Sequence, residues 1–142
     1  MPACGPFLDH RYAWEYITPM PGNMDGRNDA PAPYRLHGRV WIDGPEGTFL
    51  GYGRVVLLER IREHGSISAA ARSMNMSYRH AWDLVESMNR QAPAPLVVSR
   101  TGGRGGGGAR LTEAGERAIR LFRNAWDAYK AFEREYSRNL RF

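Results

Sequence analysis

The chain has 142 residues, enough for one domain with a modest core, and its formal net charge of +5 favours an anionic partner. It holds one cysteine, Cys4, which excludes an intrachain disulfide framework, a cysteine-based zinc site and a redox pair. No apolar run is long enough to span a membrane and no signal peptide opens the sequence, so we expect a cytoplasmic protein with no membrane partner.

Residues 1–34 form the first segment, which holds six of the nine prolines and shows no sustained hydrophobic period. This composition predicts an extended, partly disordered N-terminal arm. We assign residues 35–142 to a single folded domain.

The domain opens with alternating apolar and polar residues over 35–43, which predict a β-strand. A turn cluster at 43–47 and a short return strand at 48–50 follow. Apolar residues at helical spacing then predict a first helix that runs from Gly53 to a closing glycine, Gly65.

Residues 65–91 predict a helix-turn-helix. A short, alanine-rich helix is expected to begin near Ser68, whose hydroxyl would cap it. Asn75 tolerates the left-handed conformation that ends a helix, and Ser77 can cap the next one.

The second helix of this motif divides into two faces. The apolar face is expected to anchor it in the core and consists of Tyr78, Ala81, Trp82, Val85 and Met88. The polar face offers donors for guanine edges and phosphates and consists of Arg79, His80, Asp83, Ser87 and Arg90. This arrangement is typical of a recognition helix in a DNA major groove, and an ordinary solvated helix face is the alternative. Asp83 could accept from a cytosine amino group or orient Arg79 one turn away.

A predicted strand at 96–101, a glycine-rich tip at 102–108 and a second strand at 109–112 follow directly. A β-hairpin after a recognition helix indicates a wing. Arg100, Arg104 and Arg110 line it, and Arg104 at its tip could enter a minor groove.

The last helix is predicted to begin after the N-cap Thr112 and to extend over on the order of 25 residues. Its aromatic residues recur at spacings of three and four, and we interpret their surplus as a dimer seam. The alternative is that these aromatics pack on the chain's own first helix and arm.

No catalytic set is visible. The glycine run lacks the Lys-Ser/Thr ending and the following helix of a phosphate-binding loop, and no βαβ unit surrounds it. The four histidines show no metal-ligand spacing, and no Ser-His-Asp grouping is apparent. We expect neither an enzyme nor a metal site.

Two motifs together, GSISAAARSMNMSYRHAWDLVESMN and LVVSRTGGRGGGGARLTEAG, resemble the DNA-binding domain of the ModE family, the molybdate-dependent regulators of bacterial transcription. The resemblance covers about residues 36–136. It implies a LysR-like winged helix-turn-helix in the α+β class, mainly helical with a small β-sheet. It also implies a homodimer on a palindromic site in double-stranded DNA, regulation of molybdenum- or oxyanion-related genes, and a nucleoid-associated protein when bound.

The predicted DNA contacts combine the residue patterns with the positions that the resemblance places nearest DNA. They are Ser68, Ser77, Tyr78, Arg79, His80, Asp83, Ser87, Arg100, Thr101, Arg104 and Arg110. The resemblance places the dimer interface on the first and last helices. Its predicted residues are Val56, Arg60, Ile119, Phe122, Trp126, Tyr129, Phe132 and Tyr136.

The sequence ends at Phe142, so we expect none of the C-terminal molybdate-binding domains of the full-length family and no cofactor. Two alternatives stay open. One is a winged-helix module that binds a protein partner, and the other is direct binding of molybdate or tungstate at the glycine run and Arg104.

Overall fold

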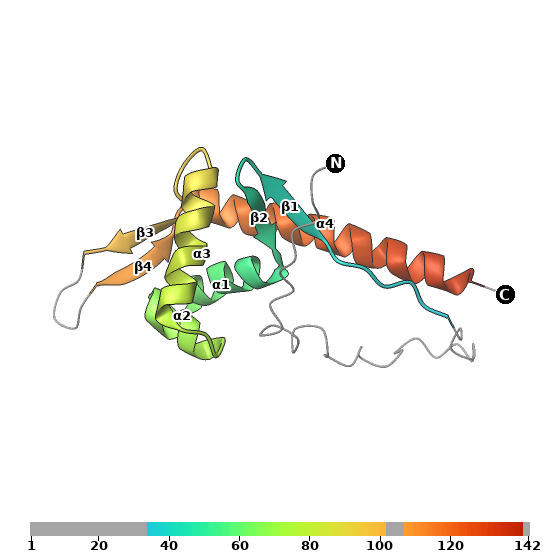
Figure 1. Cartoon of the computed structure of the whole chain (residues 1–142), viewed down its shortest axis with the longest axis horizontal. Helices are drawn as coiled ribbons and strands as arrows, with labels where there is room; N and C mark the ends of the chain where they lie inside the picture. Colours follow the sequence, from blue (N-terminus) through green and yellow to red (C-terminus); the bar gives the residue numbers. More distant parts are fainter. Residues whose placement is uncertain (1–33, 102–106, 141–142) are drawn as a thin grey trace. The chain divides into compact units, whose positions relative to one another are not determined.

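The computed structural model of the chain describes residues 34–101 and 107–140. These all fall in one structural unit, Ala32–Phe142, and the predicted arm lies almost wholly outside the described residues. The elements follow in the order β1 (Trp41–Gly44), β2 (Gly47–Gly51), α1 (Tyr52–His64), α2 (Ile67–Ser73), α3 (Tyr78–Gln91), β3 (Val97–Arg100), β4 (Gly108–Leu111) and α4 (Glu113–Arg138) (Figure 1). The predicted α+β winged helix with a long last helix is confirmed.

The ends of the helices are set by local residues, as expected. Gly65 ends α1 with φ of 71°, a left-handed conformation that favours glycine. Asn75 has φ of 53° in the turn between α2 and α3, and the Ser77 hydroxyl accepts from the His80 N–H at 3.1 Å. The expected cap of α2 was wrong: Ser66, not Ser68, accepts from Ala69.

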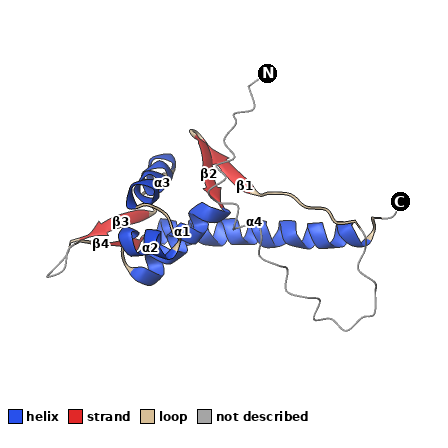
Figure 2. Ribbon diagram, turned by 60° about the horizontal axis from the view of Figure 1, so that its bottom comes forward, coloured by secondary structure: helices blue, strands red, loops and turns tan. Residues whose placement is uncertain are grey.

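The first hairpin is shorter than predicted. Of the expected strand at 35–43, only the last part pairs, because the short partner β2 reaches back no further than Trp41. Residues 34–40 lie instead along the C-terminal half of α4 (Figure 2), where the Leu36 N–H donates to Ser137 Oγ at 2.9 Å.

The core forms around α1, which contacts α2, α3, α4 and both hairpins. Its buried apolar side chains are Leu50, Val55, Leu57, Leu58, Ile61, Ala70, Ala71, Met74, Ala81, Val85, Met88, Leu96, Val97, Ala109, Ala118, Ile119 and Phe122. From α3 only Ala81, Val85 and Met88 belong to it. The prediction that Tyr78 and Trp82 anchor this helix was therefore wrong, because they are 55% and 38% exposed.

The wing is fastened at its base to the helix-turn-helix. Asn89 on α3 accepts from the N–H groups of Leu96 and Val97 at 2.8 and 3.1 Å and donates to the Val97 carbonyl at 2.9 Å. On the other strand, the Ala109 N–H donates to the Gly65 carbonyl at 2.9 Å. These bonds set where the wing begins relative to α3.

The start of α4 is also tied to the wing. Thr112 caps the helix by accepting from the Gly115 N–H at 3.1 Å, as predicted. Gly115 lies against the Leu96 carbonyl so closely that a Cβ would collide with it. The helix then continues for 26 residues, and its C-terminal half extends past the winged part (Figure 2).

Candidate nucleic-acid interface

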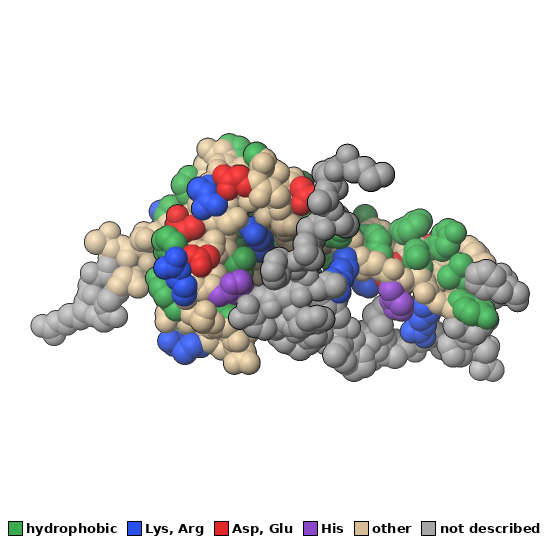
Figure 3. All heavy atoms as spheres, viewed as in Figure 1, with side chains coloured by type: hydrophobic (Ala, Val, Ile, Leu, Met, Phe, Trp, Pro, Cys, Tyr) green, Lys and Arg blue, Asp and Glu red, His purple; other side chains and the backbone are tan. Residues whose placement is uncertain are grey.

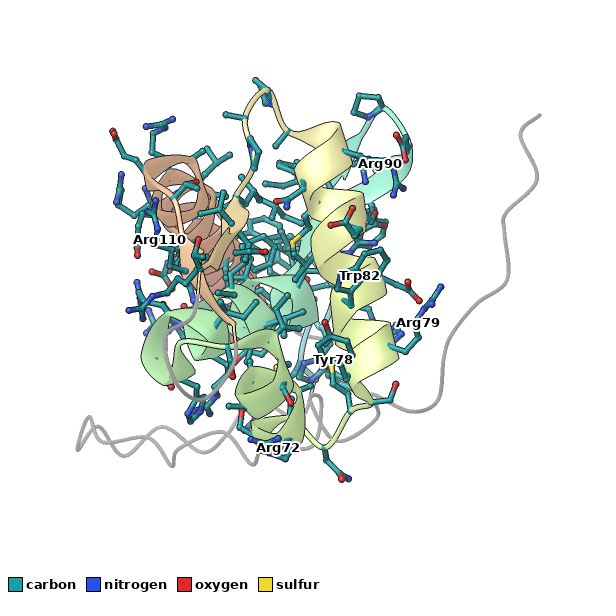
Figure 4. The ribbon with its side chains drawn as sticks, turned by 90° about the vertical axis from the view of Figure 1, so that its left-hand side faces the viewer. Arg72, Tyr78, Arg79, Trp82, Arg90 and Arg110 are labelled. Atoms are coloured by element: carbon teal, nitrogen blue, oxygen red, sulfur yellow. The ribbon has the colours of Figure 1, made fainter. Side chains whose placement is uncertain are left out.

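The N-terminal turns of α3 present the most exposed of the predicted reading residues. The Arg79 side chain is 81% exposed, and the neighbouring Tyr78 and Trp82 are also exposed. Figure 4 shows the side chains of Arg79 and Trp82 on the outer side of the helix. His80 is half-buried, so it offers less surface to a ligand than Arg79 does.

Two neighbours hold the Arg79 guanidinium. Its Nε donates to both carboxylate oxygens of Asp83 at 3.1 and 3.2 Å, as the spacing of one turn had suggested. The guanidinium carbon lies 5.7 Å from the centre of the Trp82 ring, within the range of a cation–π contact. Trp82 thus contacts Arg79 rather than filling the core.

The helix α2 adds a cation that the sequence analysis did not include. Arg72 is exposed and donates to Ser68 Oγ at 3.0 Å. Figure 4 places Arg72 below Tyr78, beyond the N-terminal end of α3. The sequence did carry a signal for Arg72, because it lies one turn after Ser68 at a position of the helix that the core does not need.

The C-terminal half of α3 is less available than predicted. Ser87 is half-buried and accepts from the Arg54 guanidinium at 3.1 Å, so its hydroxyl is already bonded within the domain, and its contact with DNA stays a prediction. Burial lowers the pKa of Arg54 from its ordinary value. Arg90 donates from Nε and Nη2 to Glu46 at 3.2 and 2.9 Å, and this hydrogen bonding lowers the pKa of Glu46.

The wing contributes Arg100, Thr101 and Arg110, which are all exposed. Figure 4 separates Arg110 from the reading residues: it lies beside α4, whereas Arg79, Trp82 and Arg90 lie along the outer side of α3. Arg104 and the glycines at 102–106 lie outside the described residues.

Charge over α3 is mixed rather than uniformly positive. Basic and acidic side chains alternate on the face shown in Figure 3, and the Arg79–Asp83 and Arg90–Glu46 pairs account for part of this pattern. Affinity for a polyanion must therefore come from particular cations and not from an unbroken basic surface.

A second exposed surface lies on α4. We call it the α4 stripe, and it consists of Leu121, Ala125, Ala128, Phe132 and Tyr136. Leu121, Phe132 and Tyr136 are more than half exposed, and the Phe132 and Tyr136 rings lie 5.6 Å apart. Figure 3 shows apolar side chains gathered over the C-terminal half of this helix.

The structure corrects the predicted dimer residues on the same helix. Ile119 and Phe122 are 5% and 0% exposed in the protomer's own core, so they cannot face a partner. Trp126 is half-buried against Phe122 and Tyr52, with ring centres 6.2 and 5.0 Å away. The remaining predicted residues are exposed or half-buried, namely Val56, Arg60, Tyr129, Phe132 and Tyr136.

Across residues 34–101 and 107–140, no group of three or more His, Cys, Asp or Glu side chains could hold a metal ion. Within the same ranges, no helix has the length and apolar character needed to cross a membrane.

Comparison with known proteins identifies the helix-turn-helix. Residues 53–116 match the bacterial regulatory helix-turn-helix protein family of the LysR type. This segment is similar to LysR-type regulatory domains. The match begins in α1 and ends in the first turn of α4, so it includes α3 and the wing.

The chain is also similar in sequence to several molybdenum-related bacterial proteins. The chain is 42% identical over 106 residues to the molybdenum transport protein ModE of Azotobacter vinelandii, which covers 75% of this chain and 37% of that protein. It is 50% identical over 76 residues to the molybdenum-pterin-binding protein MopB of Rhodobacter capsulatus, covering 54% and 28%. It is 46% identical over 69 residues to the DNA-binding transcriptional dual regulator ModE of Escherichia coli K12, covering 49% and 26%.

These relatives confirm the resemblance to ModE that the two sequence motifs indicated. The chain spans well under half the length of the relatives that it matches.

Proposed function

We propose that the chain is a ModE-like transcription regulator that binds double-stranded DNA through the N-terminal turns of α3. The observation that carries this proposal is the exposed Arg79, held by Asp83 and Trp82 at the start of the recognition helix of a LysR-type domain. A helix in this position of a winged helix-turn-helix enters the major groove with its first residues.

Phosphate contacts supply the rest of the proposed interface. Arg72 lies next to the start of α3, and Arg100 and Thr101 lie on the wing. Arginine suits this task because its planar guanidinium makes bidentate contacts with phosphate oxygens. Arg104 remains part of the proposal, although it lies outside the described residues.

The proposed functional unit is a homodimer on a palindromic site. The α4 stripe supports it, because exposed side chains such as Phe132 and Tyr136 gain free energy when a second copy covers them. Two α3 helices related by a twofold axis would then read two half-sites of inverted sequence.

The genes regulated are proposed to concern molybdenum, and this rests on the names of the relatives alone. The proposed location is the bacterial cytoplasm, with the protein on the nucleoid when bound. Mapping the bound sites on the source genome tests the target genes.

Fluorescence anisotropy with a labelled duplex tests DNA binding. The affinity should fall at least about a hundredfold between roughly 50 and 200 mM salt, because each neutralised phosphate releases counterions. Unlabelled random DNA should compete weakly with a selected site. A folded protein that binds no duplex at low salt would contradict the proposal and favour a module that binds a protein partner.

A further inference from the structure

The nitrogens of the Arg79 guanidinium fall into two groups, one bonded to Asp83 and the other exposed. Its Nε faces Asp83, and both bonds to that carboxylate come from this one nitrogen. Within the part of the chain that the structure describes, no group accepts from its two terminal nitrogens. Those nitrogens, at the tip of an 81% exposed side chain, are left to meet a ligand.

The pairing is not explained by helix stability. An acid that precedes a base by one turn suits the helix dipole, as Glu113 and Arg117 do at the start of α4 with a bond of 2.8 Å. In α3 the order is reversed, since Arg79 precedes Asp83, and the first turn of α3 carries no acid. The reversed order places a cation at the positive end of the helix, where it costs free energy, so the helix dipole gives no reason for this order.

The arginine at the other end of the same helix shows a different arrangement. Arg90 donates from Nε and from one terminal nitrogen to the same oxygen, Oε2 of Glu46, so one of its two terminal nitrogens is occupied. At Arg79 both terminal nitrogens can donate to the same ligand. That pair has the spacing that matches the O6 and N7 acceptors of guanine in the major groove.

We propose that Asp83 and Trp82 are positioning residues that hold Arg79 for bidentate recognition of one guanine in each half-site, a step that rests on the proposed function. Fixing the side chain beforehand reduces the conformational entropy lost on binding. The Asp83 carboxylate also repels phosphate, so the fixed arginine is favoured at a base edge over a backbone contact.

The test begins with selection of duplexes from a random pool by the full-length chain. Affinities are then measured for the selected site and for duplexes changed at each position. The wild type should prefer guanine at one position of each half-site by on the order of tenfold. Arg79→Lys keeps the positive charge but should lose that preference, because a lysine has no bidentate fork.

The decisive variant is Asp83→Ala, with Glu86→Ala as its matched control. Both remove one negative charge from α3, but among the described residues only Asp83 is bonded to Arg79. Asp83→Ala should reduce the guanine preference by at least about threefold, and Glu86→Ala should leave it unchanged. Both should bind random DNA as tightly as the wild type or more tightly, since a charge that repels phosphate is gone.

The outcomes separate the two proposals. If the wild type selects a site and Asp83→Ala keeps the full guanine preference, the positioning role is wrong and DNA binding stands. If the wild type selects no sequence, both the proposed function and this inference are wrong. Circular dichroism verifies that each variant is folded, and Asp83→Asn replaces the alanine variant if that one is not.

Discussion

At the scale of single residues, Trp82 and Trp126 show how two tryptophans of one domain can have different tasks. Trp82 is on the outer side of α3 and touches Arg79, whereas Trp126 packs between α1 and α4 against Tyr52 and Phe122. The sequence pattern assigned both to apolar faces, and only the packing of neighbouring elements distinguishes them.

A pair of substitutions tests this difference. Trp82→Ala should cost less than about 2 kcal/mol of folding free energy, because the side chain is already 38% exposed, and it should weaken DNA binding. Trp126→Ala removes packing against two rings and should cost more, on the order of 3 kcal/mol. Chemical denaturation measures both, and a larger loss for Trp82→Ala would contradict its placement outside the core.

At the scale of elements, Asn89 joins the recognition helix to the wing. Its three hydrogen bonds involve one side chain of α3 and two residues at the start of β3, so a rotation of the wing base must break them. This connection allows α3 and the wing strands to meet a duplex as one piece.

Loss of the Asn89 side chain should therefore affect both stability and binding. Asn89→Ala should cost about 1–3 kcal/mol, because two N–H groups and a carbonyl lose their partner. Asn89→Asp keeps the two acceptor bonds but sets a carboxylate oxygen against the Val97 carbonyl, so it should also destabilise the fold. Equal denaturation midpoints for Asn89→Ala and the wild type would show that the wing base is held by other contacts.

The elements also show what the sequence can predict. Gly65, Asn75, Ser77 and Thr112 act within a few residues of themselves, so the helix ends they set were predictable. The strand predicted at 35–43 was too long. Its first part instead contacts α4 through the bond from Leu36 to Ser137, and these residues are 101 positions apart in the sequence.

In the candidate site, too, local contacts could be predicted from the sequence and contacts between distant elements could not. The bond from Arg79 to Asp83 followed from one turn of helix, but the bond that Ser87 accepts comes from Arg54 on another helix. Asn89 carried no sequence signal, because its partners lie across a loop whose path was unknown.

At the scale of the whole molecule, the long α4 helix has two apolar faces. One face buries Ile119 and Phe122 in the protomer, and the α4 stripe on another side stays exposed. A helix that served only its own domain would not need the second face, which is why we place a second copy there.

An acidic residue in the α4 stripe should separate the copies. Phe132→Asp should shift the protein from dimer to monomer in sedimentation velocity, with little loss of the folded structure, because Phe132 is 54% exposed. Ala131→Asp places the same charge on the neighbouring, exposed position outside the stripe and should remain dimeric. A wild-type chain that sediments as a monomer at micromolar concentration would contradict the proposed dimer.

The outer side of α3 is the proposed DNA-binding surface. The most direct measurement compares Arg79→Ala with Arg134→Ala in a titration of the selected duplex. Both remove one exposed arginine, but Arg134 lies on the C-terminal half of α4, away from α3 (Figure 1). We predict that Arg79→Ala weakens binding at least about tenfold and that Arg134→Ala binds like the wild type. Equal affinities for the two variants would contradict the account.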